Sequence, residues 1–263
     1  MALPPATRDD VRLTTDVALS PAAVLPLVRG RFAVPYLWED ECGSTQDLLR
    51  GSGLPEGAVA AAEHQTSGRG RLGRRWEDRP GSSVLTSVLL RPPTGAQLPQ
   101  LSLVVGLATA EAIETVTRCP AAIKWPNDVV LDGAKVAGVL LEGDADAVVC
   151  GIGINVRQAP DELPTNTPLP ATSLGIAAGE PVDRALLLAT VLDTLERRYD
   201  TWRHDGIRPL LPAIEARNAL RGRRARAGEL TGVVGRLTED GLITLDVDGL
   251  GERSILSGEL QLL

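Results

Sequence analysis

The chain contains 263 residues, of which 43% are hydrophobic, 23% charged and 3% aromatic. These proportions exclude a disordered or fibrous chain, and the length favours one main domain with a small appendage. The formal net charge of -7 excludes nucleic-acid binding through bulk electrostatics, because domains that bind in this way carry a basic excess.

Neither a disulfide framework nor an export signal is expected. Cys42, Cys119 and Cys150 are few, odd in number and widely spaced, which is typical of reduced thiols. Residues 1–13 lack a positive segment followed by an apolar one, and no run of about 18 apolar residues occurs in the chain. We therefore expect a cytoplasmic protein with no membrane partner.

The first half of the chain predicts a short helix, two strands and a long helix. The short helix is expected near 21–29, with a proline in its permitted first turn. A buried strand is expected at 57–65, followed by a loop at 67–76, where three glycines and four arginines disfavour regular structure. The β-rich run 84–90 predicts a strand, and apolar residues at helical spacing predict a helix over 98–118.

Three strand candidates follow, at 123–131, 135–143 and 146–156. They are separated by the turn signals Asp132-Gly133 and Gly143-Asp144. Such short connections favour antiparallel hairpins over crossover connections.

A long helix and a β-rich tail complete the chain. Apolar residues from Leu188 to Trp202 recur at spacings of three and four, which is typical of a helix packed on a core. From about Asn218, short β-rich runs alternate with turn signals, which predicts a small all-β barrel of roughly 45 residues. We therefore place a main domain at 1–217 and a C-terminal domain at 218–263.

Residues 68–74, here named the arginine loop, alternate glycine with arginine. Glycines let backbone N–H groups close around an anion, and guanidinium groups form paired hydrogen bonds with a carboxylate or phosphate. One interpretation is therefore an anion site, and the other is a flexible basic surface loop or an RG-type nucleic-acid segment. The acidic net charge and the lack of aromatic residues among these arginines disfavour a nucleic-acid binder.

A second polar motif is Lys124-Trp125-Pro126-Asn127-Asp128, followed by Lys135. If the turn at Asp132-Gly133 pairs the flanking strands, Asp128 and Lys135 lie close together. A lysine there can stabilise a reacting phosphoryl group, and a carboxylate can hold magnesium. A structural ion pair on the sheet is the alternative interpretation.

The order of these motifs resembles the biotin-protein ligase family. Ser44-Thr45, Gln65, GRGRLGRRW, KWPND, KVAG and GIGIN follow one another over about residues 40–157, and the pairing of GRGRLGR with KWPND is highly specific. The resemblance implies an α+β protein with a mixed sheet backed by helices, which is the class II synthetase-like catalytic fold of biotin ligases. The β-rich tail is similar to that family's small C-terminal SH3-like β barrel.

The resemblance also implies the site residues. The positions that match the biotin site are Ser44, Thr45, Gln65, Gly68, Arg69, Arg71, Lys135, Gly138, Leu140, Gly151 and Gly153. The positions that match the ATP and adenylate site are Arg71, Arg74, Trp76, Asn127, Lys135 and Asn155. The catalytic positions are Lys135, Arg69, Arg71 and Asp128, the last as a magnesium ligand or as the base for the acceptor lysine. His64 departs from the tyrosine often found in the family, and we interpret it as a packing substitution.

The activity implied by the resemblance is ATP- and Mg²⁺-dependent activation of biotin to biotinyl-5'-AMP. Transfer would follow to a lysine of the biotin carboxyl carrier domain of acyl-CoA carboxylases and related biotin enzymes. Lipoate-protein ligases are the alternative, but their pattern lacks GRGRxGR followed by KWPND. Only 43 residues precede Ser44, so we expect the monofunctional type without an N-terminal DNA-binding domain, and no DNA partner.

Overall fold

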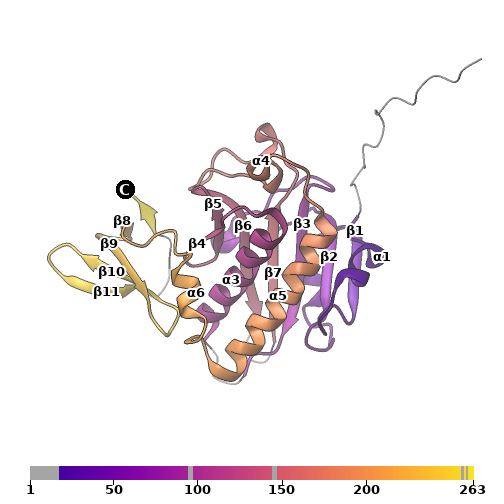
Figure 1. Ribbon diagram of the computed structural model, residues 1–263, viewed down its shortest axis with the longest axis horizontal. Helices are drawn as coiled ribbons and strands as arrows, with labels where there is room; N and C mark the ends of the chain where they lie inside the picture. Colours follow the sequence, from indigo (N-terminus) through magenta and orange to yellow (C-terminus); the bar gives the residue numbers. More distant parts are fainter. Residues whose placement is uncertain (1–17, 94–96, 144–146, 256–257, 259) are drawn as a thin grey trace, which may run out of the picture.

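The computed structural model describes residues 18–93, 97–143, 147–255, 258 and 260–263 (Figure 1). Residues 1–13 and Asp144, on which two of the expectations above depend, lie outside the described residues. Among the described helices, none combines the length and the apolar character needed to span a bilayer.

The chain forms two sheets and several helices. The helices are α1 (Pro21–Val24), α2 (Thr45–Leu49), α3 (Leu98–Thr117), α4 (Leu174–Ala178), α5 (Arg184–Asp205) and α6 (Leu211–Glu215), with 3-10 turns η1 (Leu25–Leu27), η2 (Arg71–Gly73) and η3 (Pro160–Glu162). The strands of the large sheet are β1 (Tyr36–Cys42), β2 (Val59–Gln65), β3 (Ser83–Leu90), β4 (Ala122–Lys124), β5 (Asp128–Leu131), β6 (Ala134–Gly143) and β7 (Val148–Asn155). Those of the small sheet are β8 (Arg224–Ala227), β9 (Leu230–Leu237), β10 (Ile243–Val247), β11 (Gly251–Ile255) and β12 (Gln261–Leu262).

The large sheet is mixed and has the strand order β1-β2-β3-β7-β6-β5-β4. β1 and β2 run parallel, and the other neighbours run antiparallel. The long helices α3 and α5 pack on each other and cover one face of this sheet (Figure 1). The predicted architecture, a mixed sheet backed by helices with a small all-β unit at the C-terminus, is therefore confirmed.

Side-chain alternation along β2 shows why the sheet has two buried faces. Val59 and Ala61 belong to the main core that contains α3 and α5, whereas Ala60 belongs to a second, smaller core with Leu49 of α2. Successive side chains of a strand point to opposite faces, so a strand buried on both sides has an unbroken apolar sequence. The helix α2 thus closes the second face, next to the end of β2.

The structure corrects the expectation of one strand over 123–131. This segment forms two strands, β4 and β5, with Trp125 and Pro126 in the turn between them. Proline has no N–H to donate, so it ends a strand in the sheet interior. The hairpins β5–β6 and β6–β7 are antiparallel as predicted, and β2, β3, α3 and α5 lie where the sequence places them.

The strand β1 was missed in the first 40 residues, where only a short helix was expected. It contains Glu39, Asp40 and Glu41, which are exposed and hide the apolar signal of a strand. β1 lies at the edge of the sheet, where charged side chains are common because one side of the strand faces solvent. Helices α2, α4 and α6 are each five residues long, too short for a periodic signal.

The small sheet has the order β11-β10-β9-β8-β12. Its first strand begins at Arg224, eight residues after Ala216, the C-cap of α6. Between them, Ala219 N donates to Ile123 O at 2.9 Å and Asn218 bridges to Ile123 of β4. The boundary between 217 and 218 stays a prediction.

Candidate functional site

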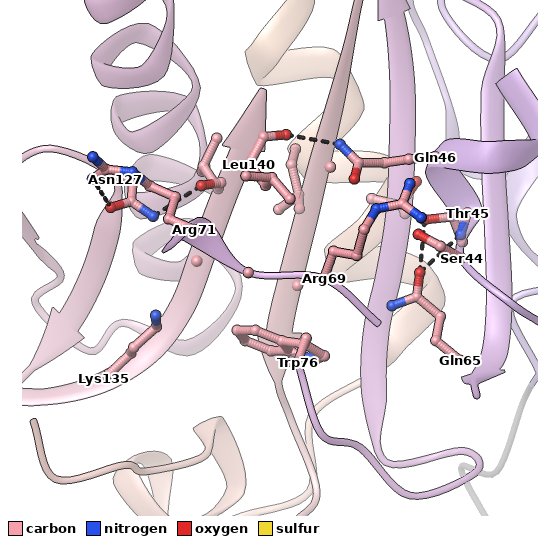
Figure 2. Close-up of a pocket in the computed structure, with 17 residues that line it drawn as sticks. Ser44, Thr45, Gln46, Gln65, Arg69, Arg71, Trp76, Asn127, Lys135 and Leu140 are labelled. Carbon is pink, nitrogen blue, oxygen red and sulfur yellow. Dashed lines mark hydrogen bonds between the residues drawn. The ribbon is translucent and has the colours of Figure 1, made fainter. Parts of the chain in front are cut away.

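A pocket lies over β6 and β7, between α2 and the arginine loop (Figure 2). Its lining residues are Ser44, Thr45, Gln46, Gln65, Arg69, Gly70, Arg71, Trp76, Thr86, Asn127, Lys135, Gly138, Val139, Leu140, Gly151, Ile152 and Gly153. The structure thus brings most of the predicted site residues together, from segments far apart in the sequence. The predicted residues outside this lining are Gly68, Arg74, Asp128 and Asn155.

One end of the pocket contains hydroxyl and amide groups. The parallel pairing of β1 and β2 places Cys42 beside Gln65, so both strands end at the same edge of the sheet. Thr45 N and Oγ1 donate to Gln65 Oε1 at 2.8 and 3.2 Å, and Thr45 Oγ1 lies 2.8 Å from Ser87 Oγ. This network fixes the positions of polar groups that can bind a planar polar ligand.

Gln46 also lines this end, and the sequence analysis missed it. Its side-chain Nε2 donates to Leu140 O at 3.0 Å and to Val149 O at 3.3 Å, and the residue is 3% exposed. The contacts join α2 to β6 and β7, and Figure 2 shows the one with Leu140 of β6. In the sequence, only its position next to Ser44-Thr45 pointed to the pocket, because its hydrogen-bond partners lie about one hundred residues away.

The floor of the pocket is a pair of glycines on neighbouring strands, Gly138 of β6 and Gly153 of β7. A Cβ on Gly153 would stand 2.7 Å from Cε2 of Trp76, and one on Gly138 would stand 3.2 Å from Cζ3 of the same ring. The glycines therefore admit a flat aromatic group against the sheet backbone. In this structure that group is the indole of Trp76, whose buried Nε1 has no hydrogen-bond partner among the described residues.

The arginine loop is tied across the pocket by Arg69. Its guanidinium donates to both carboxylate oxygens of Asp47 at 2.9 and 2.8 Å, and to Glu142 at 3.0 Å. The hydrogen bond from Arg69 holds the pKa of Asp47 below its usual range. Glu142 also pairs with Arg50. Both terminal nitrogens of Arg69 are therefore engaged by carboxylates of the protein itself.

Arg71 reaches the opposite side of the pocket. Its Nη1 donates to Asn127 Oδ1 at 2.9 Å, and Asn127 Nδ2 donates to Val139 O at 2.9 Å. Asn127 is thereby fixed to β6 and offers its oxygen to the loop. The KWPND motif and the arginine loop, 50 residues apart in sequence, meet at this contact (Figure 2).

Lys135 and Asp128 form an ion pair, with 2.7 Å between Nζ and Oδ1. The predicted proximity across the β5–β6 hairpin is confirmed. Lys135 Nζ also lies 5.8 Å from the ring centroid of Trp76. The described residues contain no cluster of three or more His, Cys, Asp or Glu that could bind a metal by themselves. Asp128 is a single carboxylate, which suits a magnesium ion held mainly by phosphate oxygens.

The other predicted residues lie beside the pocket. Gly68 is required by close packing, since a Cβ there would stand 2.5 Å from Trp76 O. Asn155 is 5% exposed, and its Nδ2 donates to Thr172 O at 3.1 Å. The adenylate contacts of Asn155 and of Arg74, an exposed loop residue, rest on the resemblance alone.

His64, interpreted as a packing substitution, forms a specific contact. Its Nδ1 lies 2.9 Å from Oδ2 of Asp78. Burial raises the pKa of Asp78, and the contact with His64 opposes this rise. The pair joins the end of β2 to the segment that follows Trp76, which is the exit of the arginine loop.

Comparisons with known proteins agree with this arrangement. A model of the biotin/lipoate A/B protein ligase family matches residues 42–157. The biotin--[acetyl-CoA-carboxylase] ligase of Mycobacterium tuberculosis is 38% identical over 226 residues, which cover 80% of this chain and 82% of that protein. The bifunctional ligase/repressor BirA of Bacillus subtilis is 35% identical over 239 residues, which cover 86% of this chain and 73% of that protein. The structure of the Aquifex aeolicus biotin protein ligase in complex with biotin and ATP matches with a TM-score of 0.79 and 35% identity, over 87% of this chain and 98% of that one.

Proposed function

Since the chain belongs to the biotin-protein ligase family, we propose that it activates biotin with ATP as biotinyl-5'-AMP and transfers the biotinyl group to a lysine of a carrier domain. The observation that carries this proposal is the composition of one pocket. Polar groups occupy one end, two glycines form the floor, and Lys135 and Arg71 supply positive charge at the other end. Such a pocket suits a flat polar ring, an apolar chain and an anion in series.

We assign the parts of biotin to these regions of the pocket. Ser44, Thr45 and Gln65 would hydrogen-bond the ureido group, because hydroxyls and an amide offer both donors and acceptors. The bicyclic ring would lie over Gly138 and Gly153, so the indole of Trp76 must move when biotin enters. The other positions proposed for biotin are Arg69, Leu140 and Gly151, which line the pocket, and Gly68, which lies beside it.

In the first half-reaction, a carboxylate oxygen of biotin attacks the α-phosphorus of ATP, and the bond to pyrophosphate breaks. Lys135 and Arg71 would stabilise the negative charge that gathers there, since preorganised cations act strongly in a pocket closed to water. Asp128 orients Lys135 through their ion pair. A magnesium ion bound at Asp128 and the phosphates would neutralise further charge. Arg74, Trp76, Asn127 and Asn155 are the remaining positions proposed for ATP and the adenylate.

In the second half-reaction, the ε-amine of the acceptor lysine attacks the carbonyl carbon of the adenylate. The carbon–oxygen bond to AMP breaks, and the amine loses a proton. Asp128 is the proposed acceptor of this proton, or a ligand of magnesium, because its carboxylate pairs with Lys135. Proximity of the two bound reactants supplies much of the acceleration.

The proposed acceptor is the biotin carboxyl carrier domain of an acyl-CoA carboxylase. Two relatives are named biotin--[acetyl-CoA-carboxylase] ligases, from Mycobacterium tuberculosis and Paracoccus denitrificans, which supports this choice. We propose a cytoplasmic location, where ATP and such carboxylases occur together.

The test is ATP-dependent release of pyrophosphate, measured with biotin and, separately, with lipoate and octanoate. We expect turnover with biotin and negligible release with the other two acids. Equal turnover of lipoate would replace this proposal with a lipoate-protein ligase, which the matching family model also includes. No release with any of the three acids would reject adenylate formation altogether.

A further inference from the structure

The turn between β9 and β10 of the small sheet packs against the KWPND motif. The indole Nε1 of Trp125 donates to Gly241 O at 3.1 Å, and Trp125 is 3% exposed. These two residues lie 116 positions apart. The turn of the C-terminal sheet thus makes a buried hydrogen bond with the KWPND motif. Asn127, two residues after Trp125 in this motif, lines the pocket.

The same turn is held by Gln100 of α3, and a residue of α5 fixes the Gln100 side chain. Gln100 Nε2 of α3 donates to Glu239 O at 2.7 Å, and Trp202 Nε1 of α5 donates to Gln100 Oε1 at 2.7 Å. Gly241 fits closely: it has a φ of +79°, and a Cβ there would stand 2.8 Å from Gln100 N. A side chain at this position would push the turn away from α3 and from Trp125.

The contact continues from Trp125 into the pocket. Ser102 Oγ of α3 donates to Pro126 O at 2.9 Å, which fixes the middle of the turn between β4 and β5. Val139 N donates to Asn127 O at 2.9 Å, and Asn127 Oδ1 accepts the hydrogen bond from Arg71. The segment 125–127 therefore has one end on the C-terminal sheet and the other end against the arginine loop.

We propose that Trp125 and Gly241 are positioning residues through which the C-terminal domain sets the nucleotide side of the active site. Their contact fixes Asn127, and Asn127 fixes Arg71. The polar end of the pocket, built by Thr45 and Gln65 on the other side of β7, makes none of these contacts. Loss of the Trp125 contact therefore weakens ATP binding and leaves biotin binding nearly unchanged. This inference rests on the proposed function.

The test uses Trp125→Phe, which removes only the N–H donor, and Gly241→Ala, which displaces the turn. Gly249→Ala is the matched control: Gly249 lies in the next turn of the small sheet, between β10 and β11, with a φ of +72°, but a Cβ there would meet no described residue within 4 Å. Dissociation constants for biotin and for a non-hydrolysable ATP analogue are measured by calorimetry, together with KM for ATP and the melting temperature.

We expect both Trp125→Phe and Gly241→Ala to raise the dissociation constant and KM for ATP by roughly three- to tenfold, the effect of losing one buried hydrogen bond. In these two variants the dissociation constant for biotin should stay within about twofold of that of the unaltered protein. In Gly249→Ala all three constants, for biotin, for the ATP analogue and KM for ATP, should stay within the same range. An equal loss of biotin and ATP affinity, or an equal effect of Gly249→Ala, would overturn the inference, as would unchanged ATP affinity in Trp125→Phe.

One readout does not depend on the proposed reaction. If the contact holds Asn127 and Arg71, trypsin should cut the arginine loop faster in Gly241→Ala than in Gly249→Ala, without any ligand present. Absence of pyrophosphate release by the unaltered protein would reject the proposed function alone. Equal cleavage rates in the two variants would reject the positioning role alone.

Discussion

The indole of Trp76 lies against the backbone of Gly153, so closely that a Cβ on this glycine would stand 2.7 Å from Cε2. Gly153→Ala should therefore narrow the space that we assign to the biotin ring. Overpacking of a tight site costs about 1–3 kcal/mol, so we expect the biotin dissociation constant to rise roughly tenfold or more. Isothermal titration calorimetry measures this change.

Gly106→Ala is the control for that variant. Gly106 lies within α3, and a Cβ there would meet Ile123 Cγ2 at 3.8 Å, an ordinary contact. Alanine stabilises a helix interior by roughly 0.5–1 kcal/mol relative to glycine, so this variant should melt higher and bind biotin normally. Unchanged biotin affinity in Gly153→Ala would show that the ligand does not use the space over β7.

Lys135→Ala should slow adenylate formation. Removal of a preorganised charge partner costs about 2.7–4 kcal/mol of barrier, a fall of roughly a hundredfold or more in single-turnover pyrophosphate release. The variant also leaves Asp128 without the partner that lies 2.7 Å away. The double variant Lys135→Ala, Asp128→Asn removes the unpaired carboxylate, and with it the group that we propose as a magnesium ligand or base. Recovery of the rate in the double variant would assign the loss to the unpaired carboxylate and not to the missing lysine.

Asp47→Asn should loosen the arginine loop without unfolding the protein. Arg69 bridges Asp47 and Glu142, and Asp47 is half exposed, so the pair contributes about 0–1 kcal/mol to stability. Because Arg69 lowers the pKa of Asp47, the carboxylate is charged at neutral pH, and its contribution would be lost only as acid protonates it below its usual range. We expect faster tryptic cleavage between Arg69 and Arg75 at neutral pH.

The control for loop opening is Glu111→Gln, which weakens another bidentate ion pair. In that pair, Nε and Nη2 of Arg198 donate to the two carboxylate oxygens of Glu111 at 2.8 and 2.6 Å. That pair joins α3 to α5 and does not line the pocket. Similar cleavage of the loop in both variants would show that Asp47 has no particular part in closing it.

Arg71→Gly should release the reactive adenylate. The guanidinium of Arg71 ties the loop to Asn127 across the pocket, and glycine removes this contact. Dissociation of the adenylate should rise more than its synthesis falls, so exposed amines of other proteins become biotinylated. The chain has only two lysines, Lys124 and Lys135, and should itself be a poor target. Incubation with biotin, ATP and serum albumin tests this, and albumin labelling no greater than with the unaltered enzyme contradicts it.

A basic cluster at the start of the small sheet is our candidate for carrier docking. Its members are Arg221, Arg223, Arg224 and Arg226, all exposed. Arg221 and Arg224 already pair with Glu215 and Asp248. Reversal of Arg223 and Arg226 to Glu should slow transfer to a biotin carboxyl carrier domain, most strongly at low salt, and leave adenylation intact.

The control for charge reversal is Arg29→Glu, which changes the net charge in the same direction. Arg29 is exposed and follows α1 and η1 in the chain, and α1 lies on the opposite side of the molecule from the small sheet (Figure 1). Two results would exclude this surface as the docking site. One is a loss of adenylation with no loss of transfer when Arg223 and Arg226 are reversed, and the other is an equal slowing of transfer in Arg29→Glu.

Local patterns in the sequence predicted much of the fold. The apolar runs of β2, β3, β6 and β7 and the periodic stripe of α5 depend on neighbouring residues, so they are visible in a short window. Paired turn residues predicted the hairpins, and from them the contact between Asp128 and Lys135. The arginine loop and KWPND were recognised because each motif is contiguous.

Tertiary structure alone decided which of these segments meet. The parallel pairing of β1 with β2 brings Thr45 to Gln65, and Gln46 reaches carbonyls about one hundred residues away. Trp76 lies over two glycines, and Trp125 reaches the small sheet, through contacts that no sequence window contains. Propensity and turn chemistry act between near neighbours, whereas these contacts depend on strand order and on how the two sheets pack.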